Sequence, residues 1–280
     1  MMRTLDGRSH PPAIDEETLT EEFLALGVGP GGVLLTHSSL RSLGPVRGES
    51  RAVVRALRAA LGPEGTLVVP AFTPENSDTS RAYQQRIQGC TEQQVEELRR
   101  TMPPYDPRHT PALSMGRLAE EVRTLPEALR SDHPQTSFAA VGPLARMIVA
   151  DHAPDCHLGE RSPLARLYEE GAKVLLLGVG FASCTAFHLA EYRVADRPLP
   201  LQEYHCVVRV RGERTWWSYT DVALDDTDFA LLGSSFERSA TSVTAGAVGR
   251  AAARLFPLRD AVDYAVAWMT AHRPSRRPQA

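Results

Sequence analysis

The stretch from Lys173 to Arg193 places the strongest constraint on the fold, because a continuous apolar run passes directly into a group of titratable side chains. Val174 to Leu177 has the length and apolarity of a strand covered on both faces, and Gly178 and Gly180 end it. Ligands of open α/β sheets bind at the carboxyl ends of such strands. We therefore expect the residues after Leu177 to stand at a ligand-binding edge.

Two earlier strands are expected in the same sheet. The apolar run at 33–35 leads into Thr36, a helix capped by Ser50 follows, and residues 66–70 form the next strand. This strand, helix, strand order predicts parallel pairing with a right-handed crossover. We expect one domain over residues 1–280, of the α/β class, with a mixed, largely parallel central sheet flanked by helices.

The rest of the chain gives weaker local signals. Helices are expected from a cap at Thr20 and over 91–100, 115–123, 144–149 and 245–272, with an antiparallel hairpin over 204–219 that turns at Gly212 and Glu213. The polar, Pro-rich segment from 72 to 111 is long enough to suggest a functional loop, an active-site lid among the options. Residues 273–280 are expected to form a disordered tail.

Charge and cysteine usage exclude several classes of protein. The formal net charge of −3 argues against a nucleic-acid binder, and the chain has no basic stripe for a membrane surface. The N-terminus lacks the apolar core of a signal peptide and no apolar run could span a bilayer, so we expect a cytoplasmic protein. The four cysteines form no Cys-x-x-Cys pair, which argues against a zinc ribbon, and no metal is expected.

The segment after Gly180 carries the candidate chemistry. His188 and Glu191 are three residues apart in a run of helix formers, so their side chains can meet on one helical face. A carboxylate raises the basicity of an imidazole and fixes its tautomer, which suits a general base near neutral pH. An ordinary surface pair has the same spacing. His157 is a rival base or an ordinary loop residue, and Cys184 is a potential nucleophile or a small buried side chain.

The segment THSSLRSLG at 36–44 offers hydroxyls, backbone amides and Arg41 where a strand ends. These groups suit the phosphates of a cofactor, although the segment matches neither a Walker loop nor the dinucleotide fingerprint. Alternatively, Ser38 and Ser39 satisfy backbone groups at a turn. Hydrolase chemistry is disfavoured because no Gly-x-Ser-x-Gly elbow is present.

Six blocks, taken in order, resemble the aminoglycoside 3-N-acetyltransferase family, also called the antibiotic N-acetyltransferase family. They are GVLLTHSSLRSLG at 32–44, ALGPEGTLVVPAFT at 60–73, YDPRHTP at 105–111, RSDHPQTSFAAVGPLA at 130–145, SPLARL at 162–167, and KVLLLGVG with HLAE between 173 and 191. The resemblance covers most of the chain. It implies transfer of an acetyl group from acetyl-CoA to an amine, on an α/β fold distinct from that of the commoner N-acetyltransferases.

The resemblance also implies roles for particular residues. It places His188 and Glu191 at the amine, with His157 as the rival base. Along the phosphates and pantetheine of acetyl-CoA it places His37, Ser38, Ser39, Leu40, Gly44, Thr110 and Ser137. A polycationic aminoglycoside needs an acidic pocket, for which the candidates are Glu75, Asp78 and Asp221, with Asp225, Asp226 and Asp228 close to the last of these.

Three functions remain open. The first is acetylation of an aminoglycoside at its 3-amino group, and the second is acetylation of another small amine in natural-product biosynthesis. The third is a non-catalytic module that binds CoA or a nucleotide. The oligomeric state is also open, a homodimer included, because fold-level similarity settles neither acceptor nor assembly.

Overall fold

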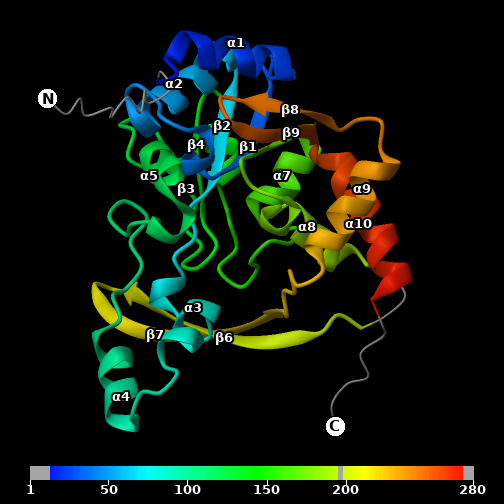
Figure 1. Cartoon of the computed structure of the whole chain (residues 1–280). Helices are drawn as coiled ribbons and strands as arrows, with labels where there is room; N and C mark the ends of the chain where they lie inside the picture. The colour runs from blue at the N-terminus through cyan, green and yellow to red at the C-terminus, as the bar shows by residue number, and fades with distance from the viewer. Residues whose placement is uncertain (1–12, 195–197, 274–280) are drawn as a thin grey trace, which may run out of the picture.

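The computed structural model describes residues 13–194 and 198–273, and its centre is a seven-stranded sheet (Figure 1). Across the sheet the strands run β3 (Leu129–Arg130), β4 (Phe138–Val141), β2 (Thr66–Pro70), β1 (Val33–Ser38), β5 (Lys173–Leu177), β9 (Ala251–Pro257) and β8 (Thr244–Val248). The pairs β1–β2 and β1–β5 are parallel and the outer pairs are antiparallel. The expected mixed sheet is confirmed, but parallel pairing is confined to the three central strands.

Helices cover both faces of this sheet. One face carries α1 (Glu16–Leu26), α2 (Glu49–Leu61) and α5 (Arg117–Arg123). The other carries α6 (Ala145–Val149), α7 (Pro163–Glu169), α8 (Phe187–Arg193), α9 (Phe229–Ser239) and α10 (Leu258–His272).

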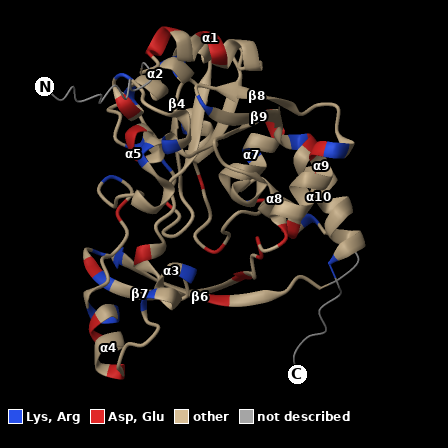
Figure 2. Cartoon of the chain, viewed as in Figure 1, with Lys and Arg blue, Asp and Glu red and all other residues tan. Residues whose placement is uncertain are grey.

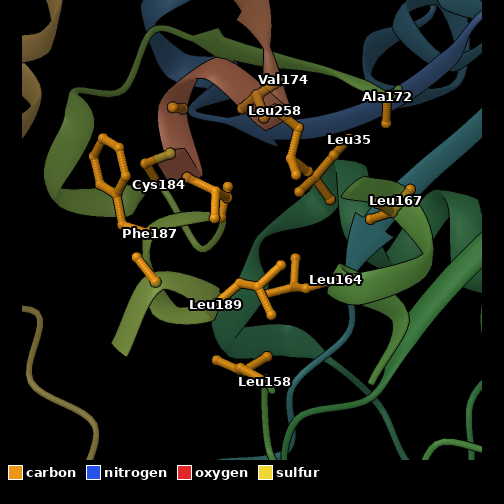
Figure 3. Close-up of a cluster of buried hydrophobic side chains, with 14 of the residues drawn as sticks. Leu35, Leu158, Leu164, Leu167, Ala172, Val174, Cys184, Phe187, Leu189 and Leu258 are labelled. Atoms are coloured by element: carbon orange, nitrogen blue, oxygen red, sulfur yellow. The ribbon is translucent and has the colours of Figure 1, made fainter. Parts of the chain in front are cut away.

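Alternation along the strands builds the two hydrophobic cores. In β5, Val174 and Leu176 face the α8 side, where Figure 3 shows Val174 among Leu35, Cys184 and Leu258. Leu175 and Leu177 face the α1 side. A strand that is apolar on both faces is typical of a sheet covered twice, as the continuous run in the sequence predicts.

A separate two-stranded hairpin lies apart from the central sheet, across the lower part of Figure 1. It consists of β6 (Leu201–Val210) and β7 (Glu213–Val222), with α3 (Arg81–Arg86) and α4 (Glu92–Thr101) beside it. The long segment at 72–111 contains these two helices and is tied to the hairpin, because the Tyr105 amide donates to the Val207 carbonyl at 2.9 Å. The hairpin and the 91–100 helix are confirmed, but the hairpin turns at Arg211 and Gly212, one residue earlier than expected.

Several boundaries differ from expectation. Helix α1 begins earlier than Thr20 implied, because the Asp15 side chain accepts from the Thr18 amide. Helix α2 follows Gly48, so Ser50 lies inside it rather than capping it. The expected helix over 245–272 is wrong in its first half, where β8 and β9 turn at Gly249, whose φ is +55°. That alanine-rich stretch has helix propensity, but pairing with β5 overrides it.

Within the described residues, no helix has both the length and the apolarity needed to cross a bilayer. Of the expected tail, Arg273 directly follows α10 and makes ion pairs, and residues 274–280 lie outside the described part of the chain.

Candidate active site

A cavity of about 350 Å³ lies at the carboxyl ends of the central strands, where the sequence predicts a ligand-binding edge. Strand β1 contributes Thr36, His37 and Ser38 to its wall, and the loop after β5 contributes Cys184. Helix α8 adds His188, and Phe229 from the start of α9 adds an aromatic face 4.7 Å from the His188 ring. Segments far apart in the sequence therefore meet at one edge of the sheet.

A close contact between the two central strand ends shapes this edge. Gly178 has a φ of +68°, and a Cβ at this position would lie 2.5 Å from the Ser42 Cβ. The Ser39 amide donates to the Leu177 carbonyl at 2.9 Å, which joins the two turns. A residue other than glycine at 178 would push the turns apart.

His188 and Glu191 form the pair that their spacing predicts. His188 Nδ1 lies 2.7 Å from Glu191 Oε2, and the two side chains are 14% and 4% exposed. An ionised carboxylate only accepts hydrogen bonds, so Nδ1 carries the proton and the lone pair resides on Nε2. The pair can thus supply an oriented imidazole base at the cavity wall.

Glu191 is held by more than His188. Its other oxygen, Oε1, accepts from the Asp225 amide at 2.9 Å and from Arg273 Nη1 at 2.6 Å. A carboxylate this deeply buried stays charged only when it is paired and hydrogen-bonded. The contacts explain how Glu191 can be an anion inside the protein.

Two further cavity residues are electrically neutral. Burial is the main cause, with a smaller electrostatic effect of nearby His188, of the lowering of the His37 pKa to about 3. His37 Nε2 is buried and has no hydrogen-bond partner within the described residues. Burial raises the pKa of the Cys184 thiol to about 12, so that the thiolate needed for nucleophilic attack is scarce at neutral pH.

A second, larger groove of about 760 Å³ adjoins the cavity, and Ser38, Ser114 and Met115 line both spaces. The predicted cofactor residues Ser38, Ser39, Leu40 and Gly44 line this groove, and His37 lines the cavity. Arg41 and Arg117 add two cations to the groove. Arg117, from the start of α5, was missed because nothing in the sequence links it to the 36–44 segment.

Thr110 and Ser137 line neither space. The Thr110 hydroxyl accepts from the Asp106 amide at 2.8 Å, as turn chemistry would require. Ser137 is fully buried, donates to the Ala71 carbonyl at 2.7 Å and accepts from Arg130 Nε at 2.9 Å. Arg130 also reaches the Thr110 carbonyl, so these residues support the wall behind the cavity.

His157 lies in a different environment from His188. It is 3% exposed and does not line the cavity. Its Nε2 lies 2.7 Å from the Tyr219 hydroxyl, and its ring centroid is 4.8 Å from that of His133. Burial, followed by the effects of His152 and His188, lowers its pKa to about 3. As a base His157 would therefore be both inaccessible and weak.

Three of the predicted acidic residues, Glu75, Asp78 and Asp221, also lie outside the cavity wall. Glu75 is exposed, whereas Asp78 is buried and pairs with Arg99 at 3.0 Å and His205 at 3.2 Å. Asp221 accepts from the Tyr192 hydroxyl and the His157 amide, both at 2.6 Å.

Asp226 is the carboxylate that the structure brings to the cavity wall, where Arg81 pairs with it at 2.8 Å. Figure 2 shows further acidic positions on the loops between the central sheet and the β6–β7 hairpin. The sequence grouped Asp226 with Asp225 and Asp228 but could not separate them, because all three lie in one acidic loop.

Comparison with known proteins gives a consistent result. The profile of the family described as aminoglycoside 3-N-acetyltransferase matches residues 35–270. The prophage-derived aminoglycoside N(3')-acetyltransferase-like protein YokD of Bacillus subtilis strain 168 is 38% identical, over 90% of this chain and 91% of its own. Aminoglycoside N(3)-acetyltransferase VII of Streptomyces paromomycinus is 36% identical, over 94% and 93% of the two chains.

Solved structures agree. The crystal structure of YokD superposes with a TM-score of 0.87 at 36% identity, covering 94% of this chain and 96% of that one. A binary complex of AAC-IIIb with CoASH (26% identity, 95% and 100% coverage) and AAC-VIa bound to sisomicin (27% identity, 93% and 98% coverage) each give a TM-score of 0.79.

Proposed function

The chain belongs to the aminoglycoside 3-N-acetyltransferase family, whose members are acyltransferases, and we propose that it transfers the acetyl group of acetyl-CoA directly to the 3-amino group of an aminoglycoside. One observation carries the proposal. The oriented His188–Glu191 pair faces a cavity that adjoins a groove built from the 38–44 segment.

The chemistry follows from this geometry. The acceptor reacts as a free amine, formed when its ammonium loses one proton to solvent. With the proton on Nδ1, His188 Nε2 accepts the second nitrogen proton as this amine attacks the thioester carbonyl. A C–N bond forms and the C–S bond breaks. The proton on His188 then passes to the CoA thiolate, so the enzyme returns to its starting state. A positioned base of this kind contributes about 10²- to 10⁴-fold to the rate.

The groove suits the cofactor. Its backbone turn at Ser38, Ser39, Leu40 and Gly44 offers serine hydroxyls. Arg41 and Arg117 supply positive charge for phosphates, and Glu49 in the same groove pairs with Arg117 at 3.3 Å. A solved family member bound to CoASH supports this assignment. We assign His37 to the thioester end, and Thr110 and Ser137 to indirect support through Arg130.

The acceptor is assigned from charge. Asp226 at the cavity wall, with the acidic loops around it, suits a cationic amine, and a relative bound to sisomicin supports an aminoglycoside. Of the other predicted carboxylates, exposed Glu75 is assigned an outer contact to the acceptor, whereas Asp78 and Asp221 act indirectly, because both are buried and bonded to other protein groups. One feature favours a second candidate, a smaller non-aminoglycoside amine: Arg81 already pairs with Asp226 and would compete with a polycation.

The test is thiol release from acetyl-CoA across a panel of 2-deoxystreptamine aminoglycosides and simple natural-product amines, with the product position determined by NMR. We expect acetylation of an aminoglycoside at the 3-amino group, and a fall in kcat of roughly 10²- to 10⁴-fold in His188→Ala. Turnover only of an unrelated amine would establish the second candidate. CoA binding without any turnover would indicate a binding module.

A further inference from the structure

The residue that follows the C-terminal end of α10 contacts the His188–Glu191 pair on its Glu191 side. Arg273 follows the last helical residue, and its side chain is 18% exposed. Its Nη1 donates to Glu191 Oε1 at 2.6 Å, on the opposite side of the carboxylate from His188. Sequence spacing does not predict this contact, because 82 residues separate the two positions.

Arg273 is itself fixed in place. Its Nε and Nη2 donate to the two carboxylate oxygens of Asp228 at 2.8 and 2.6 Å, and Nη2 also donates to the Asp225 carbonyl at 2.6 Å. A forked pair of this kind fixes the plane of a guanidinium as well as its position. The Arg273 guanidinium also lies 5.8 Å from the Phe229 ring, which touches His188.

We propose that Arg273 is a positioning residue for acetyl transfer: it keeps Glu191 ionised and oriented, so that Glu191 holds His188 in the tautomer with a free Nε2. The inference rests on the proposed function and extends it to a residue outside the cavity. Without the cation, the buried Glu191 anion would lose a charged partner, and taking up a proton would become easier. A protonated Glu191 no longer fixes the His188 tautomer.

Other titratable and charged groups surround the His188–Glu191 pair and Arg273. His37 on β1 and Asp226 in the cavity wall face the same space as His188, and His157 interacts with it electrostatically. Asp225 and Asp228 face Arg273 from the loop before α9, and His272 lines the same small pocket as Glu191 and Arg273. None of these groups donates to Glu191 Oε1 as a cation, so Arg273 has a distinct role among the described residues.

The test compares Arg273→Gln with Arg259→Gln. Arg259 is the matched control, because it lies on the same helix but donates to the backbone carbonyls of Tyr168 and Glu169. We expect Arg273→Gln to lower kcat by about 10- to 100-fold, the loss typical of removing an outer partner of a functional histidine. The KM for acetyl-CoA should stay within about twofold, since Arg273 lies outside the groove.

Two readouts separate positioning from a purely structural role. The acidic limb of the kcat/KM profile should move to higher pH in Arg273→Gln, because losing a cation favours proton uptake by the His188–Glu191 pair. In the Glu191→Gln background, adding Arg273→Gln should cost less than about threefold, because the interaction is already broken. Equal losses in both backgrounds would overturn the proposal.

Further variants keep the test decisive if Arg273→Gln folds poorly. Arg273→Lys retains the charge without the fork and should recover part of the activity, whereas Asp228→Asn should weaken activity in the same direction as Arg273→Gln. Nitrogen-15 NMR of His188 reads the tautomer without any turnover. An Nδ1–H tautomer that is lost in Arg273→Gln supports positioning even if no panel amine is acetylated. An unchanged tautomer in the folded variant refutes it.

Discussion

Cys184 shows how burial decides the role of a reactive residue. It lines the cavity four positions before His188, but burial raises its pKa to about 12, so the reactive thiolate is scarce at pH 7. We expect Cys184→Ala to keep kcat within about threefold and to lower the free energy of unfolding by about 1 kcal/mol through lost packing. Steady-state kinetics and denaturant titration measure the two effects. An acetylated Cys184 trapped by mass spectrometry would contradict direct transfer.

At the scale of single residues, sequence spacing located only partners close in the chain. His188 and Glu191 are one helical turn apart, and their contact is the one that spacing predicts. Asp78 and Asp221 were offered as substrate ligands, yet their actual partners are distant in sequence: Arg99 and His205 for the first, Tyr192 and the His157 amide for the second. Such pairings depend on tertiary structure, which a composition pattern does not contain.

At the scale of elements, the β6–β7 hairpin is joined to the domain by a buried polar cluster. The Tyr219 hydroxyl on β7 donates its one proton to Gln135 Oε1. His157 Nε2 lies 2.7 Å from the same hydroxyl, so this nitrogen carries a proton and donates it to the Tyr219 oxygen. Tyr219→Phe leaves both partners unsatisfied and should lower the free energy of unfolding by about 1–3 kcal/mol. Because the cluster lies outside the cavity wall, kcat should change by less than about threefold.

Urea titration and kinetics check this prediction, with Trp217→Phe as the control, since Trp217 stacks on Tyr219 but is only partly buried. If Tyr219→Phe lowered kcat tenfold or more at unchanged stability, His157 would again be a candidate for the general base.

The elements also show where local sequence is sufficient and where it is not. Strands β1, β2 and β5 were predictable because burial on both faces leaves a continuous apolar run. Strands β8 and β9 were not, because their alanines favour a helix in isolation. At Gly246 a Cβ would lie 3.1 Å from a Leu26 methyl of α1, so close packing at the sheet edge explains the small residues. Tertiary packing selects the strand there against local propensity.

At the scale of the whole molecule, four buried neutral histidines couple stability to pH. Burial is the leading cause of a lowered pKa in each: about 3 for His37 and His157, about 4 for His152, and well below the usual value for His133. Above about pH 6.5 both folded and unfolded chains hold these rings neutral, so they contribute no pH dependence. Below it, the unfolded chain takes up protons that the folded chain refuses, so stability falls as the pH falls from about 6.5 towards 4.

The expected size of this effect makes it measurable. At pH 5.5 each of these histidines should cost about 1.4 kcal/mol relative to pH 7.5, as an upper bound. Denaturant titrations at pH 7.5, 6.5 and 5.5 should show the decline in the free energy of unfolding. In His152→Gln the dependence of this free energy on pH should correspond to about one fewer proton taken up on unfolding. A free energy of unfolding that stays constant between pH 7.5 and 5.5 would mean that water reaches these rings, because only accessible imidazoles could be protonated equally in both states.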